Sequence, residues 1–457
     1  MEAAIILVFV MGYLAITLEH SIKIDKLIPA LVMMAICWAL IALGIEGFSQ
    51  WFDSANHTLM EGFGSWASEE KMHLMEETLL HHLGKTSEIL VFLLGAMTIV
   101  EIIDYFDGFS TIKDFIKTKK KSKILWIFAL LAFILSAIID NLTATIVLIS
   151  ILQKIVKDRN VRIWYAGLII IAANAGGAWS PIGDVTTTML WIGKKVTTGH
   201  LIGYLLLPSF LCMAVPTLIA SYLPAFRGDL EVEQVQEKKK SKFSGTMLYL
   251  GLGAIIFVPI FKVVTHLPPY VGMMLSLGVV AIFAEIYSRS QFNISHIIDG
   301  EGDDSHGFHS PVHKSLSRIE MPSVLFFFGI LMAVAALESL GMLFIGAEHL
   351  KVIIPNTDIV IMLLGVGSAV VDNVPLVAAS MGMFQQPIDD HIWHFIAFSA
   401  GTGGSMLIIG SAAGVAAMGM ERIDFIWYLK KISWLAFIGF AAGSIAFILL
   451  TGGTSGL

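Results

Sequence analysis

The sequence has few charged residues and almost no cysteine. Asp, Glu, Lys and Arg make up 14% of its 457 residues, and the formal net charge is −7. These charges gather in the segments between apolar runs, so binding to nucleic acid is not expected. The two cysteines, Cys37 and Cys212, lie inside apolar runs without metal-ligand spacing, which favours packed thiols over a disulfide or a metal site.

Hydrophobic residues, by contrast, make up 56% of the chain. That share exceeds the usual apolar content of soluble domains. Runs near the length of a bilayer span recur from end to end, and they predict an all-α polytopic membrane protein surrounded by the lipid bilayer. These runs include residues 3–18, 27–45, 88–103, 201–223, 246–261, 321–337 and 432–450.

A ten-residue motif occurs twice in these apolar surroundings. Residues 136–145 read SAIIDNLTAT, and residues 368–377 read SAVVDNVPLV. A carboxylate in hydrocarbon costs roughly 2.5–3.5 kcal/mol on insertion scales, and such residues usually mark an ion or proton path. Their recurrence in two halves of one chain predicts a transporter built from an internal repeat. The motif supplies six candidate cation ligands: Ser136, Asp140, Asn141, Ser368, Asp372 and Asn373.

Loop charge predicts the topology of the first motif. Lys and Arg in short loops mark the cytoplasmic side of a membrane, and both 111–123 and 157–162 are basic. A straight helix over 124–156 would span roughly 50 Å, well beyond the ~30 Å hydrocarbon core. It would also place basic loops on both sides of the membrane. We therefore predict a re-entrant hairpin over about 122–157, with Asp140-Asn141 near its tip.

The second motif predicts a hairpin with the opposite direction. The segment 386–391 that follows it has no Lys or Arg, so the hairpin over about 358–385 is predicted to enter from outside. Pro375 removes a backbone donor just after the Asp-Asn pair, which disfavours a continuous helix there. Two hairpins that enter from opposite sides predict two inverted-topology repeats.

The predicted repeats cover residues 1–225 and 245–457, with a basic cytoplasmic linker at 226–244. Each repeat contains a Gly-rich segment after its hairpin. These segments predict interrupted helices over about 162–195 and 391–420, which are typical of ion sites near the membrane midplane. Their polar residues complete the candidate site: Asn174, Asp184, Thr186, Thr187, Ser405 and Ser411.

The chemistry of these side chains predicts a site for a hard cation. Such ions take carboxylate, amide, hydroxyl and backbone oxygens as ligands. A carboxylate can also hold a proton in place of the cation, so the two ions can compete for one site. The alternative that the polar residues only cap helix ends stays open. It is least favourable for the aspartates, because a buried capping carboxylate in the membrane is costly.

The motifs Ser136…Asp140-Asn141, Asn174…Asp184-Val185-Thr186-Thr187 and Ser368…Asp372-Asn373 resemble those of NhaD-type sodium/proton antiporters of the ion transporter superfamily. The resemblance covers nearly the whole chain. It implies exchange of sodium, or lithium, for protons, an elevator-like transport domain and usually a homodimer. The expected location is a bacterial inner membrane, with no bound cofactor and no enzymatic activity. The sodium ligands expected from the repeated motif are Asp140, Asn141, Ser136, Asp372 and Asn373.

Other functions in the same superfamily are the main alternatives. Divalent-anion/sodium symporters resemble this chain but carry Ser-Asn-Thr at the hairpin tips, where this chain has Asp-Asn-Leu and Asp-Asn-Val. The carboxylates add negative charge where a dicarboxylate would bind, which disfavours anion uptake. A dicarboxylate/sodium symporter and an arsenite efflux permease stay as alternatives. An intramembrane aspartyl enzyme is less favoured, because no protease signature accompanies the aspartates.

Overall fold

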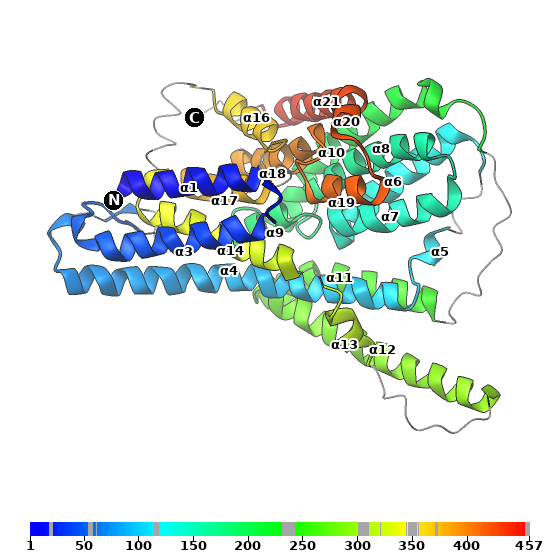
Figure 1. Ribbon diagram of the computed structural model, residues 1–457, viewed down its shortest axis with the longest axis horizontal. Coiled ribbons are helices and arrows are strands. Elements are labelled where there is room, and N and C mark those ends of the chain that lie inside the picture. The colour runs from blue at the N-terminus through cyan, green and yellow to red at the C-terminus, as the bar shows by residue number, and fades with distance from the viewer. Residues whose placement is uncertain are drawn as a thin grey trace.

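The computed structural model describes residues 1–17, 22–53, 58–60, 62–113, 118–230, 243–299, 310–319, 321–343, 345, 354, 356–370 and 373–452. Over these residues the chain is almost entirely helical (Figure 1). Nine helices in the described part are long and apolar enough to cross a membrane. The prediction of an all-α multi-pass membrane protein is therefore confirmed.

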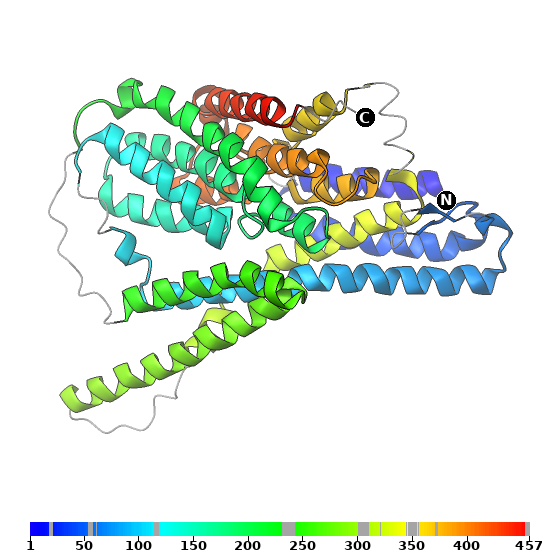
Figure 2. The same cartoon turned by 180° about the vertical axis from the view of Figure 1, so that it is seen from behind.

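One group of helices combines the first part of each half of the chain. In this group α3 packs against α1 and α14, while α4 packs against α11, α12 and α14 (Figures 1 and 2). Helix α4 has 38 residues, so the apolar run 88–103 is only its second half. The group consists of α1 (Glu2–Thr17), α3 (Leu27–Gly44), α4 (Ser68–Tyr105), α11 (Ser244–Thr265), α12 (Pro269–Asp299) and α14 (Met321–Ser339).

The second group holds the segments with the repeated motif. Here α6 and α7 pack together and against α8, and α16 and α17 pack in a similar way against α18. Helices α10 and α21 pack closely against each other beside them. The group consists of α6 (Lys121–Ile139), α7 (Asn141–Ile155), α8 (Arg159–Ala178), α9 (Val185–Ile192), α10 (Thr198–Ser221), α16 (Thr357–Gly367), α17 (Asn373–Met383), α18 (His391–Gly403), α19 (Ala412–Glu421) and α21 (Ser433–Thr451).

Helix breaks fall inside the four segments where hairpins and interrupted helices were predicted. Helix α6 ends immediately before Asp140, and α17 begins at Asn373. The chain is also non-α between α8 and α9 and between α18 and α19. These breaks free backbone groups, and they bring polar side chains into the interior of the second group. The direction of each hairpin relative to the membrane stays a prediction.

Two glycines allow α6 to approach α8 closely, and α16 to approach α18. A Cβ atom at Gly176 of α8 would collide with the Phe133 carbonyl of α6. A Cβ atom at Gly403 of α18 would collide with the Gly365 carbonyl of α16 in the same way. Only glycine lets the backbones come this close, which explains why both segments are rich in glycine.

Shorter elements lie between the long helices, and two of them, α5 and η3, lie between the two groups. The described part of the predicted linker docks on the start of α6, where Leu230 N donates to Lys119 O at 2.9 Å and Lys121 N donates to Gly228 O at 3.1 Å. The short elements are η1 (Ile45–Gly47), the antiparallel strands β1 (Phe52–Asp53) and β2 (Thr58–Leu59), η2 (Phe63–Ser65), α5 (Ser110–Lys113), η3 (Pro224–Phe226), α13 (Pro311–Leu316), η4 (Gly404–Met406) and α20 (Phe425–Lys431).

Candidate functional site

The carboxylate of Asp184 is the centre of a buried polar cluster. Asp184 is the N-cap residue of α9, and its Oδ1 accepts a hydrogen bond from Thr186 N at 3.0 Å. The residue is only 2% exposed. Because the cap fixes the carboxylate at a helix N-terminus, its charge faces the positive end of the α9 dipole.

Two asparagines from different halves of the chain bind this carboxylate. Asn141, the first residue of α7, donates from Nδ2 to Asp184 Oδ2 at 2.9 Å. Asn373, the first residue of α17, donates from Nδ2 to Asp184 Oδ1 at 3.4 Å and Oδ2 at 3.2 Å. The starts of the two motif helices therefore meet at a single carboxylate.

Asn174 extends the cluster to the second interrupted helix. Its Oδ1 accepts from Asn141 Nδ2 at 3.0 Å, and its own Nδ2 donates to Ser405 Oγ at 2.9 Å and Ser411 Oγ at 3.0 Å. Ser411 is the N-cap of α19, with backbone angles φ −148° and ψ 152° that nearly match those of Asp184, φ −148° and ψ 149°. The two interrupted helices thus have the same local geometry, but only the first carries a carboxylate at this position.

The serines of the repeated motif have equivalent backbone partners. Ser136 Oγ donates to Ala173 O at 2.6 Å, and Ser368 Oγ donates to Ala400 O at 2.7 Å. The first bond ties the end of α6 to α8, and the second ties the end of α16 to α18. The serines border the cluster, and their hydroxyl protons are already committed to these carbonyls.

Asp140 holds the start of α7 in place. Its Oδ1 accepts from Thr143 N at 2.8 Å, and its Oδ2 accepts from Thr143 Oγ1 at 2.8 Å. Its backbone has φ 79° and ψ 159°, a region that costs of order 1–3 kcal/mol for a residue with a side chain. The carboxylate therefore caps the helix that presents Asn141. Its counterpart Asp372 lies outside the described residues.

Threonines supply further oxygens around Asp184. The Thr186 hydroxyl is buried and has no hydrogen-bond partner among the described residues. Thr187 Oγ1 donates to Asp184 O at 2.9 Å. Thr145, which the sequence motifs do not single out as a ligand, also has a buried hydroxyl with no hydrogen-bond partner among the described residues. It lies four residues after Asn141, a spacing that places both on one face of α7 and could have identified it.

The donor set of the cluster suits a monovalent hard cation. Within the described residues, no three His, Cys, Asp or Glu side chains come together as a metal site. The cluster instead combines the Asp184 carboxylate with amide and hydroxyl oxygens, including the unpartnered Thr186 hydroxyl. Each amide has a donor end and an acceptor end, so a rotated Asn141 or Asn373 would present an oxygen to a cation.

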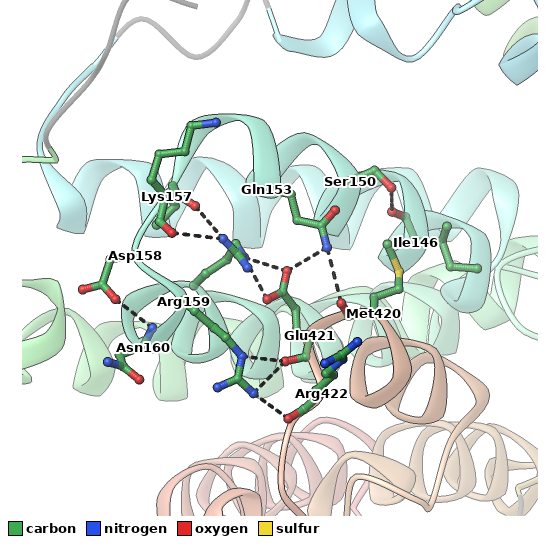
Figure 3. Close-up of polar contacts among 12 residues, drawn as sticks. Ile146, Ser150, Gln153, Lys157, Asp158, Arg159, Asn160, Met420, Glu421 and Arg422 are labelled. Carbon is green, nitrogen blue, oxygen red and sulfur yellow. Dashed lines mark hydrogen bonds and ion pairs between the residues drawn. The ribbon is translucent and has the colours of Figure 1, made fainter.

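A second polar network closes one end of this helix group (Figure 3). Arg162 Nε donates to both oxygens of the buried Glu421 carboxylate, at 2.7 and 2.8 Å, and Gln153 Nε2 donates to Glu421 Oε1 at 3.0 Å. Arg159 donates to the backbone oxygens of Glu421 and Arg422. The network ties together the end of α7, the start of α8 and the end of α19. The sequence alone does not single out Glu421, because a single charge near a helix end has no distinctive pattern.

Proteins of known family have sequences similar to this chain. A family model described as Citrate transporter (CitMHS) matches residues 8–395. Sodium/proton antiporter 1 of Arabidopsis thaliana is 41% identical over 452 residues, which cover 98% of this chain and 72% of that protein. The Na(+)/H(+) antiporter NhaD of Vibrio cholerae serotype O1 is 30% identical over 464 residues, covering 98% and 91%. The chain belongs to the NhaD-type sodium/proton antiporter family.

A solved structure shares the fold of this family member. The crystal structure of the Alcanivorax borkumensis YdaH transporter, described as having an unusual topology, superposes with a TM-score of 0.60 at 11% sequence identity. The match covers 94% of this chain and 98% of that chain. At this identity the likeness concerns the fold alone, and the antiporter relatives carry the family assignment.

Proposed function

We propose that this chain exchanges sodium ions for protons across the membrane, with lithium as an alternative ion, and that Asp184 holds either ion. The observation that carries the proposal is the position of the buried Asp184 carboxylate between Asn141 and Asn373. These residues begin two helices from opposite halves of the chain. An ion bound there would contact both halves, so its binding and release can be linked to their movement.

The cluster can satisfy the Asp184 carboxylate in each ionic state. With neither ion bound, the two amide groups donate to it, as they do here. When sodium binds, we propose that the amides rotate to present their oxygens, and the Thr186 hydroxyl adds another. When a proton binds, the acid donates to a rotated amide oxygen instead. The two ions compete, because each needs the same carboxylate in a different state.

The charge of the cluster opposes the transport of an anion. The donors of its hydrogen bonds include the amides of Asn141, Asn174 and Asn373, which carry no positive charge. A dicarboxylate would meet the negative charge of the Asp184 carboxylate at the centre of the cluster. This favours sodium/proton exchange over a dicarboxylate/sodium symporter or an arsenite efflux permease. We likewise propose a transport role without enzymatic chemistry.

The test is a pH-dye assay on vesicles that contain the purified protein and hold an acidic interior. Addition of sodium or lithium outside is expected to raise the interior pH, whereas potassium gives no response beyond that of protein-free vesicles. Citrate or succinate added with constant sodium serves as the control for anion transport. Uptake of labelled dicarboxylate without sodium-driven proton movement would contradict the proposal.

Asp140 and Asp372 stay proposed ligands because of their place in the repeated motif. Asp140→Asn keeps an oxygen that accepts from Thr143 N, and Asn caps helices as well as Asp. The loss of charge beside Asn141 is expected to raise the apparent KM for sodium about tenfold. Removal of a side chain that orients an ion's ligand typically weakens ion binding by at least this factor. Sodium titrations of exchange in vesicles measure this effect. An unchanged KM would limit Asp140 to capping α7.

The cellular setting is proposed from the family. Its members with similar sequences include bacterial NhaD antiporters, so we propose a bacterial inner membrane as the location. A homodimer is expected from the family resemblance. Cross-linking of the protein in native membranes would test it: a product of twice the monomer mass is expected, and monomer alone would count against the assembly.

A further inference from the structure

A cavity of about 570 Å³ lies where the two groups of helices meet. Helices α4 and α14 line one wall, and the later turns of α9 and α17 line the other. Met189 and Ala378 are lining residues. Met189 lies five residues after Asp184, and Ala378 lies five residues after Asn373. Five residues of helix correspond to a rise of about 7.5 Å. The cavity is therefore separated from the cluster by little more than one turn of helix.

The other side of the cluster is closed by packed side chains. Helices α7 and α19 extend away from α17 in Figure 1 and end at the buried Glu421 network. Arg162 and Gln153 fill the space around that carboxylate. An ion that reaches Asp184 in this conformation has a cavity on one side and an ion pair on the other.

The cavity wall carries a carboxylate that faces basic residues. Glu338 projects from α14, and Lys195, which is buried, follows α9. Lys195, Glu338 and Lys85 of α4 all line this cavity, so their charges act on one another. The buried amide of Gln385 has no hydrogen-bond partner among the described residues, on either its oxygen or its nitrogen. A hydrated cation in the cavity would thus find a carboxylate and an unsatisfied amide oxygen.

We propose that the cavity is the access vestibule of the Asp184 cluster, and that Glu338 attracts the incoming cation there against the repulsion of Lys195 and Lys85. This rests on the proposed function, because it takes sodium as the ion. Charged groups around a cleft change the local ion concentration by their summed potential. Removal of Glu338 therefore weakens cation capture, and removal of Lys85 strengthens it.

The first test measures access without transport. Cys37 and Cys212 are replaced by Ala, and Met189→Cys or Ala378→Cys is introduced. A cationic, membrane-impermeant thiol reagent is expected to label both variants from one side of oriented vesicles, and sodium is expected to slow the reaction. Gln153→Cys, at the closed network, is the control and is expected to react far more slowly. Equal rates at Met189→Cys and Gln153→Cys would overturn the vestibule.

The second test measures the charge effect in the Met189→Cys background. Glu338→Gln is expected to raise the sodium concentration for half-maximal protection about three- to tenfold, and Lys85→Gln to lower it by a similar factor. High choline chloride should shrink both shifts, because salt screens charges near water. Equal protection in both variants would overturn the role of Glu338. If the vesicles show these shifts but no sodium-driven proton movement, the vestibule stands and the proposed exchange function fails.

Discussion

Asp184→Asn is expected to abolish sodium/proton exchange while the protein still folds and inserts. Asn is nearly isosteric with Asp and keeps an oxygen that can accept from Thr186 N, so the start of α9 is preserved. It cannot carry a negative charge, and it offers no carboxylate on which proton and sodium compete. The pH-dye response of vesicles with this variant should equal that of protein-free vesicles, at matched protein content.

Asp158→Asn is the matched control for this change. Asp158 is the N-cap of α8 and accepts from Asn160 N at 2.9 Å, but it is exposed. Both substitutions thus replace a capping aspartate by asparagine, and only one of them alters the polar cluster. Asp158→Asn should exchange at the wild-type rate. Wild-type exchange in Asp184→Asn would instead make that carboxylate a structural cap.

The membrane class could be predicted from sequence because it depends on local composition. Apolar runs of bilayer length predicted a helical fold with many membrane-spanning helices. The interleaving of the halves could not be predicted in the same way. The packing of α3 on α14 joins segments almost 300 residues apart, and no local pattern specifies which apolar helix contacts which. The polar first half of α4 gave no apolar run, so its continuity with the run 88–103 was not predicted.

The sequence predicted some residues of the hydrogen-bonded cluster but not their internal arrangement. Costly polar residues in apolar runs identified Asn141, Asn174, Asp184 and Asn373, which the structure joins by hydrogen bonds. Their sequence gave Asp140 and Asp184 similar weight. In the structure the two carboxylates differ in their partners. Asp140 turns back to Thr143, whereas Asp184 projects toward two asparagines, because the backbone differs at the two helix starts. Side-chain direction of this kind depends on tertiary packing.

The buried network at Glu421 also depends on tertiary packing, and its disruption is expected to have a large effect on stability. Arg162→Met should lower stability strongly, because it leaves the Glu421 carboxylate, whose side chain is 0% exposed, without its cation. Removing one partner of a buried pair typically costs about 3–5 kcal/mol. We expect a fall of roughly 5 °C or more in the melting temperature of the detergent-solubilised protein, measured by intrinsic tryptophan fluorescence.

The size of this loss should depend on which partner is removed. Glu421→Gln should be milder, because the Arg162 side chain is 17% exposed and also donates to the Val156 and Lys157 carbonyls. The double variant Arg162→Met/Glu421→Met should recover most of the lost stability, since no buried charge is left unpaired. Arg159→Met is the control, because Arg159 is exposed and contacts only backbone oxygens of this network. A double variant less stable than Arg162→Met would show that the pair itself, rather than an isolated buried charge, determines the stability of this end of the helix group.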